Sequence, residues 1–150
     1  MKIKTLTKGE VEKNPNLIWD AFVGLVGLEK YNDLAEGQRA AHLVYWYDNE
    51  VQNVGHLQYF ANRRSQYLAE TIVALRLLGA ECQRLILCEA AELFLSRERS
   101  PIQTVRDFSA AAMEGEFSRL DSRFYACVPS LYECLQTYLA LHQSSFVIIA

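Results

Sequence analysis

A stripe of apolar residues at spacings of four and three constrains the fold of this chain more than any other feature. The stripe consists of Ala40, Val44, Tyr47, Val51 and Val54. This spacing places side chains on one face of an α-helix, so it predicts a long helix over residues 37–54 with one face packed against other elements. Gly55 follows directly, and glycine takes positive φ at a helix end at little cost. We therefore predict that the helix ends at Gly55 and that a short helix carrying Phe60 follows.

Helical periodicity recurs along the rest of the chain. It predicts further helices over residues 14–27, 65–78, 80–95, 101–113, 117–124 and 131–142. Asn14 before Pro15 and Ser100 before Pro101 are typical helix starts, and Ser65 can cap a third. The helix over residues 80–95 is apolar nearly all round, which predicts a place in the middle of the fold. The fold class that follows is all-α: a single-domain bundle of about seven to eight helices with short loops.

The two ends of the chain differ from this helical pattern. Residues 1–13 are charged and aperiodic, which predicts a loosely held N-terminal arm before a single helical domain over residues 14–150. Residues 146–149 are apolar but too few to anchor a membrane. This tail either tucks under the bundle or seals a subunit contact, as in a homodimer.

Composition excludes several classes of protein. The apolar fraction is 51% and the net charge is −3, so the chain is globular and offers no basic stripe for direct nucleic-acid binding. No segment reaches the ~20 consecutive apolar residues of a membrane span. The first residues carry lysines without a following hydrophobic region, so we expect no secretory signal and a cytoplasmic protein.

The cysteines and histidines show no metal-binding pattern. The four cysteines are six or seven residues apart within each pair, and no His-x-x-x-His pair exists, so we expect neither a metal nor a cofactor. Buried free thiols in a reducing cytosol fit this spacing best. The cysteines are Cys82, Cys88, Cys127 and Cys134.

Polar side chains are concentrated around Gly55. They are Glu50, Asn53, His56, Gln58 and Asn62. If they converge on one ligand, they form a recognition pocket of amides and a carboxylate. Alternatively, they satisfy backbone groups that the helix break leaves without partners. We favour the second interpretation, because a helix end buried without partners is costly and buried polar groups mostly bond to the backbone.

Glu89, Asp121 and Arg123 are candidates for a structural polar network. Glu89 falls within an otherwise apolar stripe of helix 80–95, so we expect it to be a paired carboxylate. Asp121 lies near the start of helix 117–124, where an acid accepts amide hydrogen bonds, so we expect it to cap that helix. Arg123 points elsewhere on the same helix and should reach Glu50 or Glu89.

No catalytic constellation accompanies these residues. Glu50 with His56 or His42 could form an acid–base pair, but nothing supplies a nucleophile or an oxyanion site. The seven glycines are scattered and form no phosphate-binding loop. We therefore expect a non-enzymatic protein.

Three segments share motifs with one known family. Residues 50–62 read EVQNVGHLQYFAN, residues 70–81 read ETIVALRLLGAE, and residues 120–125 read LDSRFY. Together they resemble a bacterial family of unknown-function domains whose characterised representative is a DNA-mimic protein. Its motifs are a Glu-Val-x-Asn-Gly-Gly-Phe-x-Gln-Phe-Phe-x-Asn segment, a helix ending in Gly-Ala, and a Leu-Asp-x-x-Phe-Tyr signature. Val54 and His56 depart from the first motif.

The resemblance implies an all-α fold and, for the known member, an acidic surface that occupies the DNA-binding face of a transcriptional regulator. Duplex DNA carries about one charge per 1.7 Å of helix axis, which a nearly balanced chain imitates poorly. We expect a cytoplasmic protein that binds another protein, a regulator or a toxin that it blocks, with DNA mimicry as the narrower form. The alternative is a small-ligand-binding or enzymatic domain that uses the segment from Glu50 to Asn62.

Overall fold

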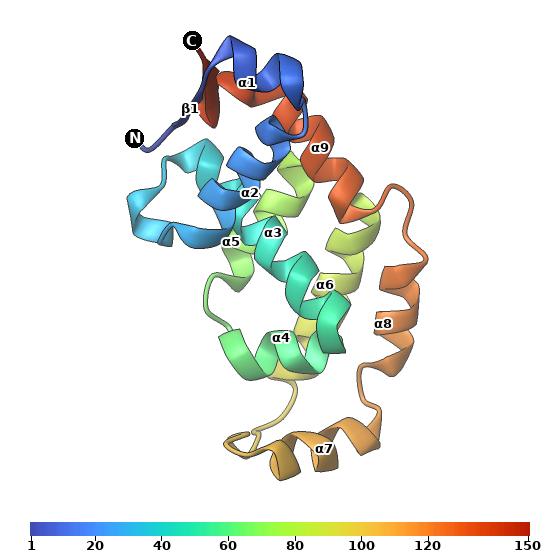
Figure 1. Cartoon of the computed structure of the whole chain (residues 1–150). Coiled ribbons are helices and arrows are strands. Elements are labelled where there is room, and N and C mark those ends of the chain that lie inside the picture. Colours follow the sequence, from blue (N-terminus) through green and yellow to red (C-terminus); the bar gives the residue numbers. More distant parts are fainter.

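The computed structural model covers all 150 residues and is all-α, as predicted. The two short strands pair with each other, and the rest of the regular structure is helical (Figure 1). In chain order, the elements are β1 (Lys4–Leu6), α1 (Lys8–Lys13), α2 (Leu17–Leu28), a 3-10 turn (Tyr31–Asp33), α3 (Glu36–Val54), α4 (His56–Arg63), α5 (Leu68–Leu77), α6 (Glu81–Leu95), α7 (Val105–Glu114), α8 (Ser118–Tyr125), α9 (Leu131–His142), a second 3-10 turn (Gln143–Ser145) and β2 (Val147–Ile149).

Helix α3 is the centre of the fold. It packs against α2, α4, α5 and α9, and its apolar stripe is buried from Ala40 to Val51. Val54, at the end of the stripe, is 46% exposed because the helix leaves the core there. The prediction that the helix of residues 80–95 lies in the middle is wrong. Helix α6 packs against α5 and α8 and leaves Leu85 exposed on its outer side.

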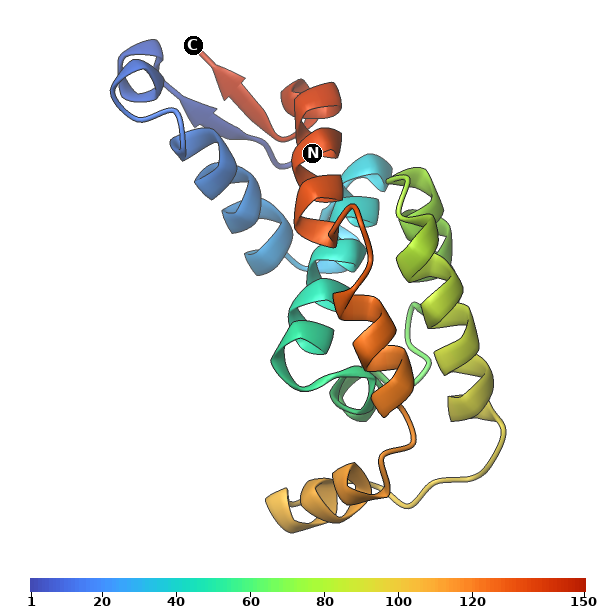
Figure 2. The same ribbon diagram turned by 90° about the vertical axis from the view of Figure 1, so that its right-hand side faces the viewer.

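The N-terminal arm is structured, contrary to the prediction for residues 1–13. Strand β1 pairs in parallel with β2, with Lys4 opposite Val147, and α1 follows it (Figure 2). The buried side chain of Gln38 on α3 donates to the carbonyls of Lys2 and Ser145 and so ties both ends of the chain to the bundle. Strands of three residues show no recognisable alternation, which is why the sequence did not reveal them.

The apolar tail tucks into the molecule. Phe146 and Val147 are almost fully buried, and the ring of Phe146 packs edge-on against Phe22 of α2. Of the two alternatives for this tail, the structure therefore favours packing within the chain.

Both helix starts that were predicted from a proline begin later in the structure. Helix α7 begins four residues after Pro101, and its cap is Thr104, which forms a reciprocal capping box with Asp107. Helix α2 begins at Leu17, after a turn in which the Asn14 side chain accepts from the amide of Asn16. At α7 a capping box nearer the first apolar turn took precedence over the proline, whereas the N-cap of α2, Asn16, makes no side-chain capping hydrogen bond.

The expectation that all four cysteines are free thiols is also wrong. Cys82 and Cys127 form a disulfide that joins the start of α6 to the turn after α8, while Cys88 and Cys134 are free. The bond pairs one cysteine from each sequence pair across a separation of 45 residues, so local spacing could not indicate it. No helix is both long and apolar enough to cross a membrane.

Candidate functional site

Helix α3 ends where the sequence predicted. Gly55 has φ 98°, outside the range that side-chain-bearing residues adopt readily, and its amide still donates to the carbonyl of Val51. The same Val51 carbonyl accepts a 2.8 Å hydrogen bond from the Tyr125 hydroxyl of α8. A carbonyl at the helix end therefore receives an extra partner from another helix.

A buried network begins at the next residue. The amide and the ring Nδ1 of His56 both contact Oδ1 of Asp121, at 2.9 and 2.7 Å. Nε2 of His56 lies 2.7 Å from the hydroxyl of Tyr47. Asp121 thus caps the start of α4 from α8, whereas the sequence predicted that it would cap its own helix. The two residues are 65 positions apart, so this contact cannot be read from local sequence patterns.

The groups of this network are matched as hydrogen-bond donors and acceptors. Burial raises the pKa of Tyr47, so its phenol keeps its proton and can donate to Nε2 of His56. The remaining ring proton then lies on Nδ1 and points at the Asp121 carboxylate. His56 and Tyr47 are both 0% exposed, so no substrate can reach either group.

Glu50 forms a second, separate interaction. Its Oε1 accepts from Arg63 at 3.3 Å, while Oε2 is buried without a hydrogen-bond partner. Burial raises the pKa of the Glu50 carboxyl, and the nearby Arg63 opposes this effect. A buried carboxylate oxygen without a partner destabilises the ionised form.

Glu50→Gln should therefore gain stability relative to the wild type as the pH rises. The pKa of Glu50 is above its ordinary value of 4.5 in the folded chain, so the folded chain binds this proton more tightly than the unfolded chain does. Ionisation then costs stability as the pH passes through the folded pKa. Urea unfolding of both proteins between about pH 4 and pH 7 measures the difference. A difference that stays constant over this range would contradict the raised pKa.

The remaining residues of the predicted corner do not converge. Asn53 and Asn62 are exposed, and Gln58 is half-buried. None of the five polar residues lines the large cavity described below. The cavity is therefore not the recognition pocket considered for these residues, and His56 with Asp121 supports the alternative that they satisfy a helix end.

The predicted contact of Arg123 is confirmed for one of its two candidate partners. Its guanidinium donates two hydrogen bonds to Glu89, at 2.6 and 3.1 Å, and makes none to Glu50. Hydrogen bonds from Arg123 lower the pKa of Glu89. Glu89 is paired as expected, but its side chain is 44% exposed, so the pair contributes little to stability.

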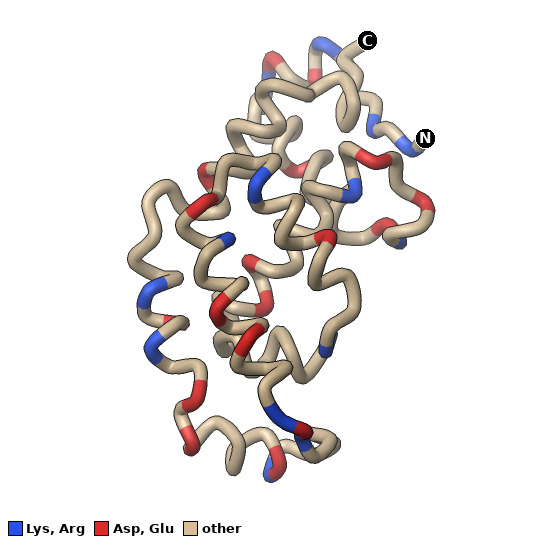
Figure 3. Tube along the Cα trace, turned by 180° about the vertical axis from the view of Figure 1, so that it is seen from behind, with Lys and Arg blue, Asp and Glu red and all other residues tan.

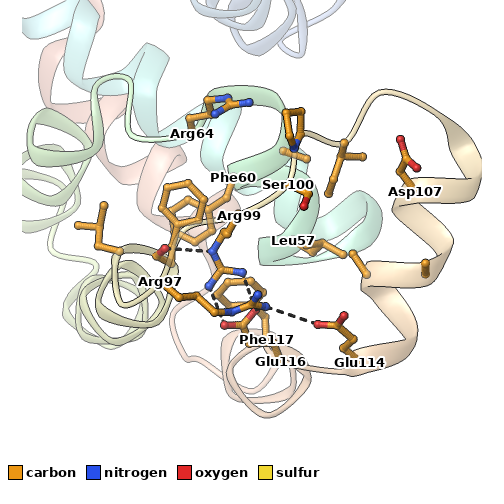
Figure 4. Close-up of a pocket in the computed structure, with 17 residues that line it drawn as sticks. Leu57, Phe60, Arg64, Arg97, Arg99, Ser100, Asp107, Glu114, Glu116 and Phe117 are labelled. Carbon is orange, nitrogen blue, oxygen red and sulfur yellow. Dashed lines mark hydrogen bonds and ion pairs between the residues drawn. The ribbon is translucent and has the colours of Figure 1, made fainter.

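A cavity of about 480 Å³ lies elsewhere, between α4, α7 and the loop that joins α6 to α7 (Figure 4). Its apolar wall includes Leu57 and Phe60 from α4 and Phe94 from α6. Phe60 and Phe94 stack with their ring centroids 4.4 Å apart. The sequence analysis missed this cavity, because its walls come from segments that are distant along the chain.

A cluster of ion pairs joins the chain just before the α7 segment to the chain just after it. Arg99 donates two hydrogen bonds of 2.6 Å to Glu116, and Arg97 contacts both Glu114 and Glu116 (Figure 4). Hydrogen bonds from Arg99 lower the pKa of Glu116. The guanidinium of Arg99 also lies over the rings of Phe94 and Phe117, 5.2 and 5.6 Å from their centroids. The segment between Arg99 and Glu116 is thus held at both ends.

Metal-binding groups are not clustered in the fold. No three side chains of His, Cys, Asp or Glu are grouped so that they could hold a metal ion.

Comparison with known proteins gives one match. The family model described as DMP19-like protein matches residues 32–142, which include α3 to α9. No curated protein and no solved structure matches the chain.

Proposed function

Because the chain belongs to the DMP19-like protein family, we propose that it acts by binding another protein and not by catalysis. The observation that carries the proposal is an exposed apolar stripe on α5. Ala69, Val73 and Leu77 are spaced by four residues and all face outward, with Val73 67% and Leu77 61% exposed. A regularly spaced apolar stripe with no partner in its own chain is typical of a protein interface.

The distribution of charge supports contact through this stripe over imitation of DNA. Acidic and basic residues are interspersed along the whole chain (Figure 3). Eight of the 18 Asp and Glu residues already lie within ion-pair distance of Lys, Arg or His. DNA mimicry needs a dense, unbroken row of negative charge. Because the acidic residues are interspersed with basic ones, DNA-mimic inhibition of a DNA-binding regulator or toxin is the narrower form of the proposal, and binding of a protein through the α5 stripe is the broader one.

The proposed location is the cytoplasm, and the partner is a protein and not a nucleic acid. In a reducing cytoplasm, glutathione and thioredoxin would keep Cys82 and Cys127 as thiols except under oxidising conditions. Both forms of the protein are therefore relevant to partner binding.

Charged substitutions in the α5 stripe should abolish binding of the partner protein. The immobilised wild type is compared with Val73→Glu/Leu77→Glu in quantitative capture from a lysate of the source cell. We expect one protein to be captured by the wild type and lost with this variant, because two charges in an apolar contact prevent its desolvation. The matched control is Val105→Glu/Met113→Glu on α7, where both side chains are more than 80% exposed.

Two outcomes would contradict the proposal. In the first, the α5 variant and the α7 control capture the same proteins as the wild type. In the second, sedimentation shows that only a second copy of the chain binds the stripe, which would make it a homodimer contact. Duplex DNA added to the captured complex tests the narrower form, because a DNA mimic and DNA compete for one face of the partner.

A further inference from the structure

We propose that the cavity beneath α7 binds a small organic carboxylate with an apolar body. The cavity is about 480 Å³ and half-open, within the range of pockets that hold small molecules. It is separate from the stripe on α5 that we propose as the protein-binding surface.

Apolar residues from two parts of the chain line this cavity. Leu57 and Ala61 of α4 lie on one side, and Ile102 and Ala111 lie on the other, and all four are only half-buried. No residue of α7 is buried, and the helix stands at the end of the molecule opposite the termini (Figures 1 and 2). An apolar molecule between these two groups of residues would supply the packing that α7 lacks.

The charged side chains around the cavity indicate that its ligand carries one negative group. Three acids line it, and each is already engaged: Glu114 and Glu116 with arginines, and Asp107 with the backbone amides of Gln103 and Thr104. Arg97 and Arg99 are neutralised by the two glutamates. Arg64 is the one charged lining residue with no hydrogen bond or ion pair from its side chain.

The position of Arg64 suits it to this role. It ends α4 with φ 52°, one of only two residues other than glycine with positive φ in the chain. Strained backbone is often found at ligand sites, where the surrounding structure fixes it. Figure 4 shows Arg64 at one rim of the cavity, away from the cluster of Arg97, Arg99 and Glu116. A guanidinium matches a carboxylate through two parallel hydrogen bonds.

A carboxylate fits better than a phosphate. One unpaired cation balances one negative charge, and the other charged groups that line the cavity are already paired, so a second negative charge on the ligand would find no partner. Phe60 and Phe94 belong to an apolar wall of the cavity, so the body of the carboxylate should be apolar, and a naphthalene ring can serve as the probe.

Naphthoate and its neutral isostere naphthamide test the proposal on the full chain. Calorimetric titration should show one saturable naphthoate site per chain and binding of naphthamide weaker by about five- to tenfold, as expected for loss of a charge-assisted hydrogen bond at a half-open site. Amide NMR signals of Leu57, Phe94 and Ala111 should shift on binding. Unsaturable binding, or shifts confined to other residues, would overturn the proposal.

Two pairs of variants test separately whether Arg64 binds the carboxylate and whether the apolar body occupies the cavity. Arg64→Gln should abolish the preference for naphthoate over naphthamide, while Arg106→Gln, an exposed arginine of α7 outside the cavity, should keep it. Ala111→Trp should fill the cavity and weaken both compounds at least tenfold, while Ala112→Trp, exposed on the same helix, should not. A preference that survives Arg64→Gln, or equal effects of the two tryptophans, would refute the site. Thermal melts of each variant establish that it is folded.

Discussion

Gly55→Ala should lower the free energy of unfolding by roughly 2–4 kcal/mol, from backbone strain and loss of a helix cap together. Gly55 has φ 98°, so any side chain there is strained. A Cβ would also stand 2.8 Å from Cγ of Asp121, closer than real contacts allow. Asp121 would have to move away from the His56 amide, which would then lose its partner. Gly55→Val should cost more still, because its branched side chain adds to both effects.

Gly79→Ala is the matched control in urea unfolding. Gly79 also has positive φ, 73°, but an added Cβ would meet nothing within 4 Å. Only the conformational strain remains, so we expect a loss of about 1 kcal/mol. Equal losses for Gly55→Ala and Gly79→Ala would show that the approach of Asp121 to Gly55 has no energetic consequence.

A double-mutant cycle then identifies Asp121 as the cause. Asp121→Ala removes the carboxylate that the new Cβ would meet, so Gly55→Ala should cost less in that background than in the wild type. The coupling between the two substitutions should exceed ~1 kcal/mol, because residues in direct contact are not additive. Strict additivity would contradict the proposed clash.

The sequence predicted the parts of this fold that are determined locally. The stripe from Ala40 to Val51 and the glycine after it were enough to place α3 and its end. Periodicity shows which face of a helix is buried, but it does not show which helix covers that face. For this reason the apolar pattern of residues 80–95 predicts that α6 lies at the centre, whereas the structure has α3 there.

The candidate site shows the same limit. The polar residues around Gly55 were identified, but the partner that organises them, Asp121, comes from α8, 65 residues away. The pairing of β1 with β2 and the cavity beneath α7 likewise depend on segments that meet only in the folded chain. Glu89 could be identified as a carboxylate that needs a partner because it falls within an apolar stripe, and of the two partners expected for Arg123, Glu50 and Glu89, the structure shows Glu89.

Loss of the Cys82–Cys127 disulfide should lower the free energy of unfolding by about 3–4 kcal/mol, because the bond closes a long loop and restricts the unfolded chain. The sequence separation is 45 residues. The bond also fixes the start of α6 to the turn after α8, next to the helix that supplies Asp121 and Arg123. Reduction should therefore loosen the packing of α8 before the rest of the bundle unfolds.

Three measurements test this expectation. Alkylation of the unfolded, unreduced protein followed by mass spectrometry should modify only Cys88 and Cys134, which are free. Urea unfolding with a phosphine reductant should match that of Cys82→Ser/Cys127→Ser, and the reductant should not change the stability of that variant. If the protein is first treated with oxidised glutathione and all four cysteines are then alkylated in the unfolded, unreduced chain, the disulfide does not form. Hydrogen exchange should then show faster opening of α8 in the reduced protein than in the oxidised one, because the disulfide holds the turn after α8 to the start of α6.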